Sequence, residues 1–315
     1  LQELLGLRKV LIHSFARMNF VRTVLSKRKL TWFVSQGLVE DWFDPRFPTV
    51  QGVMRRGVSV TALRQFIYGQ GASRRIVNME WDKFWSQNKK MYEPTAPRYM
   101  GVAADSAVEL RLEGVEGAEG DIRTIQVPLV PKDPSLGHRA CRIESTVLLE
   151  WDDAQPAAEG EVVTLMRWTN VRLTKVVPAA ATDGAGEVVA LEGVVLPEAD
   201  PAVTKTTRKL SWLAKTGNAV AAKLVEFDYL ITKDRLEDDD KLEDFVNPHT
   251  KAESDAWVDP AMRSLNVNDV VQLERRGFFR CDRPYLGPGK PLSLFLIPDG
   301  KTKAMSTLTK ALKHV

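Results

Sequence analysis

The feature that most constrains this fold is a change of pattern at Glu93-Pro94-Thr95-Ala96-Pro97. Before it, apolar side chains recur at helical spacing. After it, short runs that alternate apolar and polar residues, such as Val108–Leu112, are separated by Gly, Pro and Asp, which is typical of half-buried strands. Helices followed by barrels is an unusual order for one compact domain. The sequence therefore predicts a multidomain α+β chain whose last roughly two hundred residues form an all-β region, most simply two barrels.

Helix starts can be predicted in the first part. Ser59 is a predicted N-cap, and its helix presents an apolar face made of Val60, Leu63, Phe66 and Ile67. Asn78 is the predicted cap of a following helix with core residues Trp81, Phe84, Trp85 and Asn88. Residues 1–11 also have the pattern of the middle of a helix, so we expect the sequence to be cut from a longer one. Residues 236–244 are predicted to be an exposed acidic loop, and residues 179–186 a hairpin tip.

Charge is spread unevenly over the 315 residues. Residues 1–100 contain 17 Lys or Arg and 7 Asp or Glu, a net +10, whereas the remainder has 27 and 34, a net −7. Such a chain can offer a basic surface to a polyanion, although a solvated helical face would give the same counts. No apolar run is long enough to cross a bilayer. Cys141 and Cys281 are far apart, which predicts two buried free thiols and no zinc cluster.

The sharpest local signal is Ser26-Lys27-Arg28-Lys29, which stands where a helix is expected to begin. The free N–H groups of a helix start suit a phosphate, and Lys and Arg add charge and donors. These cations could therefore stabilise charge that develops on a transferring phosphate. An exposed basic helix start is the alternative interpretation of the same four residues.

The neighbouring segments resemble one family in the family's own order. The matching stretches are Arg17-Met18-Asn19, residues 25–34, Trp42-Phe43-Asp44-Pro45-Arg46-Phe47-Pro48-Thr49-Val50, residues 52–57, residues 77–83, Ala96-Pro97-Arg98-Tyr99, residues 209–214, residues 229–233, residues 272–279 and Ile297-Pro298-Asp299-Gly300. Together they resemble class I glutamyl- and glutaminyl-tRNA synthetases, in which Ser26–Lys29 would be the local form of the KMSKS signature. Four of these stretches are similar to the eukaryotic cytosolic glutamyl type. Phe43 departs from the family, which usually has an acid there.

The resemblance implies a domain order and an ATP site. Residues 1–37 would end a class I catalytic region, residues 38–98 would be a helical subdomain that contacts the tRNA stem, and residues 99–315 would be an anticodon-binding β domain of two barrels. Lys27 would be catalytic. The residues implied to bind ATP are Arg17, Met18, Asn19, Leu25, Ser26, Lys27, Arg28 and Lys29. The family's HIGH signature does not occur in these residues, so we expect it in a longer parent protein and expect this part alone to be inactive.

The resemblance also implies anticodon readers. Arg139, which follows Gly137 and His138 on a predicted loop, would meet the first anticodon base or, alternatively, only backbone phosphate. Gln272 and Arg275 would read the central uridine, because their donors and acceptors match the uracil edge. An unbroken strand would send these two side chains to opposite faces. We therefore expect regular pairing to stop between Glu274 and Gly277; otherwise Arg275 pairs with an acid and Gln272 faces water.

The implied reaction attaches glutamate to tRNA(Glu) through a glutamyl-adenylate, with ATP and its magnesium as cosubstrate. The implied location is the cytoplasm, and a multi-synthetase complex could form through regions outside this sequence; neither membrane nor DNA is expected as a partner. Two alternatives remain open. The chain could belong to a glutaminyl-tRNA synthetase, or it could be a non-catalytic tRNA-binding module. An intact Ser26–Lys29 cluster argues against the second, because a pure binding module needs no ATP loop.

Overall fold

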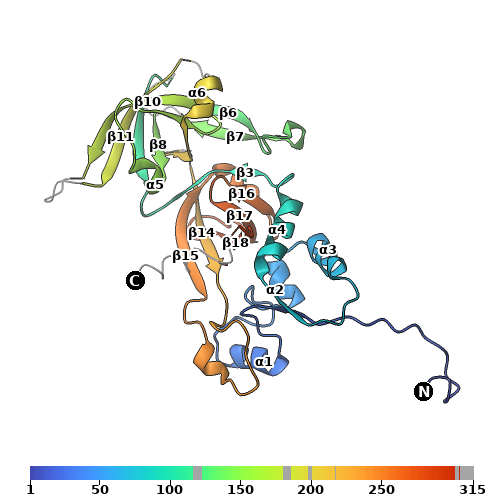
Figure 1. Ribbon diagram of the computed structural model, residues 1–315. Coiled ribbons are helices and arrows are strands. Elements are labelled where there is room, and N and C mark those ends of the chain that lie inside the picture. Colours follow the sequence, from blue (N-terminus) through green and yellow to red (C-terminus); the bar gives the residue numbers. More distant parts are fainter. Residues whose placement is uncertain (116–122, 180–185, 198–200, 217, 302–304, 306–315) are drawn as a thin grey trace.

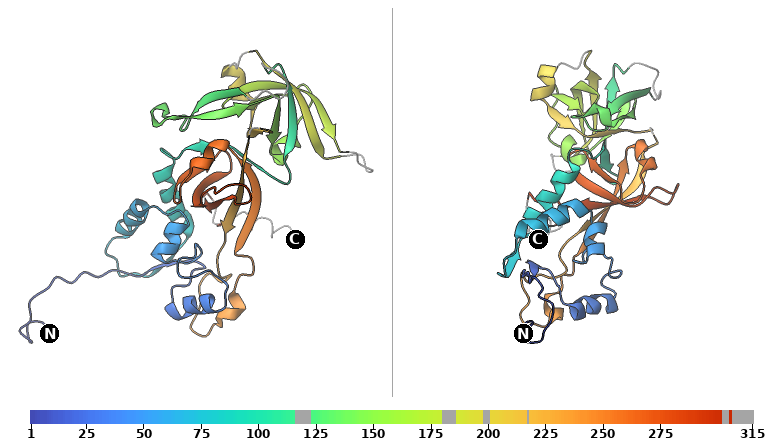
Figure 2. Two further views of the ribbon diagram at one scale, coloured as in Figure 1. Left: turned by 180° about the vertical axis from the view of Figure 1, so that it is seen from behind. Right: turned by 90° about the vertical axis from the view of Figure 1, so that its right-hand side faces the viewer.

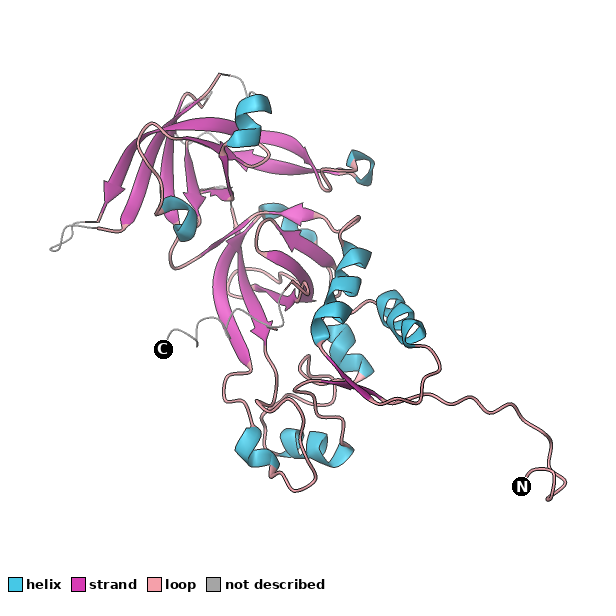
Figure 3. Cartoon of the chain, in the orientation of Figure 1, coloured by secondary structure: helices cyan, strands magenta, loops and turns pink. Residues whose placement is uncertain are grey.

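The computed structural model describes residues 1–115, 123–179, 186–197, 201–216, 218–301 and 305. The chain is elongated, with a helical region below, one β-sheet unit in the middle and another above (Figure 1). Helices and strands are largely segregated along this axis (Figure 3). The predicted α+β multidomain fold, with a helical region followed by an all-β region, is confirmed. Within the described ranges, no helix is long and apolar enough to span a membrane.

The helical region begins with a short strand and contains four helices. Its elements are β1 (Met18–Phe20), α1 (Lys27–Ser35), α2 (Val50–Arg55), α3 (Val60–Gln70), β2 (Val77–Met79) and α4 (Trp81–Tyr92). The Ser59 side chain accepts a hydrogen bond from the Ala62 N–H at 3.0 Å, so the predicted cap of α3 is confirmed. The predicted core face of α4 is also confirmed, because Trp81, Phe84, Trp85 and Asn88 are all buried.

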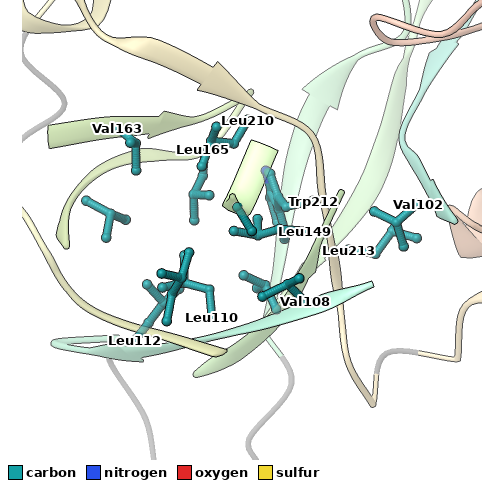
Figure 4. Close-up of a cluster of buried hydrophobic side chains, with 14 of the residues drawn as sticks. Val102, Val108, Leu110, Leu112, Leu149, Val163, Leu165, Leu210, Trp212 and Leu213 are labelled. Carbon is teal, nitrogen blue, oxygen red and sulfur yellow. The ribbon is translucent and has the colours of Figure 1, made fainter. Parts of the chain in front are cut away.

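The upper sheet has the order β12-β9-β10-β11-β5-β8-β13. Its strands are β5 (Val108–Glu113), β8 (Thr146–Leu149), β9 (Val162–Leu165), β10 (Thr169–Pro178), β11 (Val188–Val195), β12 (Arg208–Leu210) and β13 (Trp212–Ala214), joined by α5 (Trp151–Ala154) and α6 (Pro201–Thr206). A separate hairpin of β6 (Arg123–Pro128) and β7 (His138–Ile143) extends from it, with η1 (Pro134–Leu136) at its turn. The alternation predicted at Val108–Leu112 is confirmed, because Val108, Leu110 and Leu112 point into the core (Figure 4).

The lower of the two large sheets, which is the middle unit of the chain in Figure 1, has the order β3-β16-β17-β18-β14-β15-β4. Its strands are β3 (Arg98–Tyr99), β4 (Gly101–Ala103), β14 (Val220–Phe227), β15 (Lys251–Val258), β16 (Val270–Leu273), β17 (Gly277–Arg283) and β18 (Leu292–Ile297), with η2 (Leu242–Phe245) and η3 (Pro260–Ser264) in its connections. The sheet curls strongly about its own core (Figure 2). Cys281 lies in that core and Cys141 in the upper one, and both are free and buried, as predicted.

Several local predictions were wrong. Residues 1–11 form turns and extended chain, with Leu1, Leu4 and Leu11 highly exposed, because no described element covers an apolar helix face there. Asn78 lies in β2, and Glu80 is the N-cap residue of α4. In α3, Val60 and Ile67 are exposed because the helix packs through Ala62 and Phe66 instead.

The acidic segment 236–244 is not simply exposed. It belongs to the long connection between β14 and β15, and its Leu236 and Leu242 pack with Leu30 and Phe33 of α1. Figure 1 shows η2 of this connection directly beside α1. A segment of the all-β region therefore supports the helix that carries the basic cluster. Residues 180–185 of the predicted hairpin tip lie outside the described residues, as do residues 302–304 and 306–315.

Candidate functional sites

The basic cluster lies at the start of α1. Ser26 is the N-cap residue, in extended conformation, and its side chain makes no capping hydrogen bond. Lys27 and Arg28 are exposed, and within the described ranges neither forms a salt bridge. The helix start thus presents backbone N–H groups, a hydroxyl and cations to solvent, which together suit a phosphate.

A pocket of about 480 Å³ gathers most of the predicted nucleotide residues. Its predicted members are Arg17, Asn19, Leu25, Ser26, Arg28 and Lys29. Asn19 lies in β1 and Arg17 immediately precedes this strand, which is held in place because Asn19 pairs with Asn78 in the parallel ladder with β2. The Arg17 Nε donates to Asn19 Oδ1 at 2.9 Å. Two separate segments therefore form one side of the pocket, and their role in binding ATP stays a prediction.

Two predicted residues are placed differently. Met18 packs against the apolar cluster of Phe20 and Trp81, so its side chain helps to form the core behind the pocket. Lys27 is exposed but does not line the pocket, and its carbonyl accepts from the Thr31 hydroxyl at 2.9 Å within α1. The catalytic role of Lys27 stays a prediction.

The opposite wall of the pocket comes from the connection between β14 and β15. Asp234, Arg235, Leu236 and Asp238 line it. The Asp234 carboxylate accepts from Arg22 Nε at 2.8 Å, and its carbonyl accepts from the Arg22 N–H at 2.9 Å. This wall could not be predicted from the sequence, because it depends on contacts between residues more than two hundred positions apart.

The second candidate site lies at the junction of the two sheets. Regular pairing stops as expected: β16 ends at Leu273, β17 begins at Gly277, and these two residues pair. Arg275 lies in the turn between them with φ 67°, a left-handed conformation that is uncommon for a residue with a side chain. Its guanidinium is paired with Asp153 of α5, with Nη2 to Oδ1 at 2.8 Å. The acid partner foreseen in the alternative interpretation is therefore present, and it lies on α5, which connects β8 and β9 of the upper sheet.

Gln272 has an unsatisfied buried atom. Among the described residues, its Oε1 has no hydrogen-bond partner, and the same holds for Nε of Arg98. The two residues are in register on the parallel strands β16 and β3, so their side chains share one face. Two residues that each have one buried polar atom unsatisfied within the described part of the chain thus share a face of the sheet, close in sequence to the turn of Arg275. Arg98 was missed as a site residue, because the pairing of β3 with β16 cannot be read from either segment alone.

Arg139 lies on the strand β7 and not on a loop, so its predicted placement was wrong. Its side chain is only 3% exposed and forms an ion pair with the Asp259 carboxylate, whose side chain is equally buried. Its Nε also donates to the Arg98 carbonyl at 3.0 Å. The alternation of β7 turns Arg139 inward and leaves His138 exposed. A contact between Arg139 and a base remains a prediction. Arg139 would have to break its buried ion pair with Asp259 to make it.

Three family models match the chain in succession. The catalytic-domain model of class I tRNA synthetases (E and Q) matches residues 1–94. Two anticodon-binding-domain models of the same class match residues 96–192 and residues 209–282. The boundary near residue 95 coincides with the change of pattern in the sequence.

Curated relatives show the same affiliation. The chain is 48% identical over 300 residues to a cytoplasmic glutamate–tRNA ligase of Arabidopsis thaliana, covering 95% of this chain and 40% of the relative. It is 43% identical over 303 residues to the corresponding Saccharomyces cerevisiae protein, with 95% and 40% covered. It is 42% identical over 314 residues to a bifunctional glutamate/proline–tRNA ligase of Mus musculus, with 97% and 20% covered. The chain thus spans two fifths or less of these relatives. It belongs to the class I glutamyl/glutaminyl tRNA synthetase family and is of the eukaryotic cytosolic glutamyl type.

Proposed function

We propose that the chain is the tRNA-binding C-terminal part of a glutamyl-tRNA synthetase, which attaches glutamate to tRNA(Glu) with ATP through a glutamyl-adenylate. The observation that carries this proposal is the similarity, over 95% of the chain, to relatives named as glutamate–tRNA ligases. We assign residues 1–37 to the end of the catalytic region, residues 38–98 to the stem-contact subdomain and residues 99–315 to the anticodon-binding domain. The relatives' names also support a cytoplasmic location.

The nucleotide part of the proposal rests on the pocket at the start of α1. Arg17, Asn19, Ser26, Arg28 and Lys29 would hold the ATP phosphates, because they supply donors and positive charge on one side of a single pocket. Magnesium would accompany ATP. Among the described residues, no group of three or more His, Cys, Asp or Glu is arranged to hold a metal ion, so this part of the chain supplies no cage for it.

Lys27 is proposed to stabilise charge on the departing pyrophosphate. Such a group acts mainly in the transition state, so Lys27→Ala in the parent enzyme should slow adenylate formation by about a hundredfold or more while ATP binding changes little. Pre-steady-state kinetics of the activation step measure this. An unchanged activation rate would remove Lys27 from the mechanism.

The anticodon part of the proposal rests on the junction of the sheets. Arg275, Gln272 and Arg98 would together contact the central uridine, since two donors and one acceptor match its carbonyls and its N–H. Charging of a tRNA with an altered central base tests this: Arg275→Ala should reduce the preference for the cognate tRNA. An assembly of several synthetases, if formed, is proposed to involve regions outside this sequence.

A further inference from the structure

The turn between β16 and β17 places three consecutive charged residues against α5 and the turn between β9 and β10 of the upper unit. Glu274 accepts from Arg167 Nε and Nη2 at 3.0 and 2.8 Å. Arg275 forks onto Asp153, and Arg276 donates to the two oxygens of Glu150 at 2.7 and 3.1 Å. Asp153 and Glu150 both lie at α5, so one short helix receives two adjacent arginines.

The pair of Arg275 and Asp153 is asymmetric. The Asp153 side chain is 8% exposed, whereas that of Arg275 is 45% exposed. Arg275 uses Nη1 and Nη2 to bind the carboxylate. A guanidinium has five N–H groups, so the Nε edge remains, and no acceptor for it occurs among the described residues. The edge formed by Nη1 and Nη2 is thus bound to Asp153, while the Nε edge has no protein partner within the described residues.

The backbone that carries this carboxylate is itself held in place. The Asp153 carbonyl accepts from Arg208 Nη1 at 2.7 Å, and Arg208 forks onto Glu161 at 2.7 and 2.8 Å. The left-handed backbone at Arg275 further restricts where its side chain can start. A planar donor held in one orientation loses little entropy when it binds a ligand.

We propose that Asp153 is a positioning residue for anticodon reading: it holds the Arg275 guanidinium so that the free Nε edge faces the central base. This rests on the proposed function, in which Arg275 reads that base. The competing explanation is that the pair only attaches the two sheets, as the neighbouring pair of Arg276 and Glu150 would. The two explanations differ in which tRNAs a substitution affects.

The test measures binding of the chain to tRNA(Glu) and to a transcript whose central anticodon U is replaced by C. Asp153→Asn keeps the size of the side chain and removes the anionic partner of the fork. It should reduce the preference for U by about tenfold, mainly by weakening cognate binding. The matched control is Glu150→Gln, which removes the adjacent pair and should leave the preference within about twofold of the unmodified chain.

Several outcomes overturn the proposal. If Asp153→Asn and Glu150→Gln weaken both RNAs equally, the pairs only attach the sheets. If Asp153→Asn raises the preference, Asp153 competes with the base for Arg275. Arg275→Lys provides a test that leaves Asp153 in place: lysine keeps the charge but has no second edge, so the preference should be lost. A retained preference would also overturn the proposal.

Failure of the proposed function gives a different result. If Arg275→Ala leaves the preference of the unmodified chain intact, Arg275 is not a reader, whatever Asp153 does. If Arg275→Ala removes the preference and Asp153→Asn does not, only the positioning role fails. If Arg275 reads the base and Asp153 positions it, the variant with both substitutions should have the same preference for U as Arg275→Ala alone. The two residues then act as one unit.

Discussion

The lower sheet is joined to its two neighbours by different kinds of contact. Toward the helical region, Phe278, Ile297 and Tyr229 share one apolar cluster with Trp81 and Trp85 of α4. Toward the upper sheet, Met100 and Val102 join the upper core, and the turn at residues 274–276 forms three ion pairs there. The Glu274 carbonyl also accepts a longer hydrogen bond, at 3.5 Å, from the Ser211 hydroxyl. We refer to these as the helical junction and the inter-sheet junction.

The two junctions differ in what their contacts do: the apolar cluster holds two parts of the chain together, whereas the ion pairs orient individual side chains. Apolar burial is non-directional and is little affected by salt, so the helical junction can fix the pocket at α1 firmly to the lower sheet. Arg–carboxylate forks are directional, and exposed ones contribute little net stability. We therefore expect the inter-sheet pairs to place specific side chains and the helical junction to provide most of the stability.

Trp85→Ala should give the largest loss of stability. Trp85 is 2% exposed, stacks on Trp81 at 5.9 Å and donates to Met305 Sδ at 3.2 Å. Emptying this position should lower the free energy of unfolding of the helical junction by about 4 kcal/mol. Urea denaturation followed by circular dichroism measures it. Tyr68→Ala on exposed α3 is the control and should change little; equal losses in both variants would contradict an apolar helical junction.

Arg139→Ala should rank second. It leaves the Asp259 carboxylate buried without its partner, which should cost about 3 kcal/mol of unfolding free energy. The same denaturation experiment measures it, together with tRNA binding for each base at the first anticodon position. Unchanged stability with altered preference at that base would instead restore Arg139 as a reader.

The contrast between Arg139 and Ser59 explains what the sequence could predict. The cap at Ser59 and the core face of α4 depend on residues within one turn of a helix, so local pattern was sufficient. Arg139 was misplaced because its partners, Asp259 and Arg98, are 120 and 41 positions away. The residues of the α1 pocket were predicted from family resemblance. The acidic wall of that pocket, and the strand register that places Gln272 beside Arg98, could only be seen in the tertiary fold.

Asp44 should give the third effect, and it should depend on pH. Burial would raise its pKa, but hydrogen bonds and charge from Arg46 outweigh burial and lower the pKa below the ordinary value of 3.8. An acid with a lowered pKa stabilises the fold above its ordinary value, and that contribution is lost as pH falls through the folded value. Asp44→Asn should therefore cost about 2 kcal/mol at neutral pH.

The Asp44→Asn deficit should shrink as the pH falls below the ordinary value of 3.8 and through the lowered pKa of the native carboxyl, because the native side chain then loses its charge as well. Denaturation midpoints of both proteins across pH 3–7 measure this convergence. The link from Arg46 Nη1 to the Thr250 hydroxyl, at 2.6 Å, connects this pair to the start of β15. A deficit that is constant over the whole pH range would show that the charge of Asp44 contributes nothing.

Glu150→Gln should have the smallest effect on stability, about 1 kcal/mol or less. The Glu150 and Arg276 side chains are 18% and 25% exposed, so salt can screen their attraction. The difference from the unmodified chain should be smaller in about 1 M salt than in about 0.1 M salt, where the Debye length is about 10 Å. A large, salt-independent loss would make the inter-sheet junction resemble the helical one.

The most direct test of this account is equilibrium binding of the chain to tRNA(Glu) over a range of salt concentrations, together with a glutamate-dependent pyrophosphate exchange assay. We expect binding that weakens steeply with salt, because the net +10 of residues 1–100 must meet phosphates. We expect a preference for U at the central anticodon position and no exchange activity by these 315 residues alone. Binding that ignores the anticodon, or pyrophosphate exchange by the chain itself, would contradict the account.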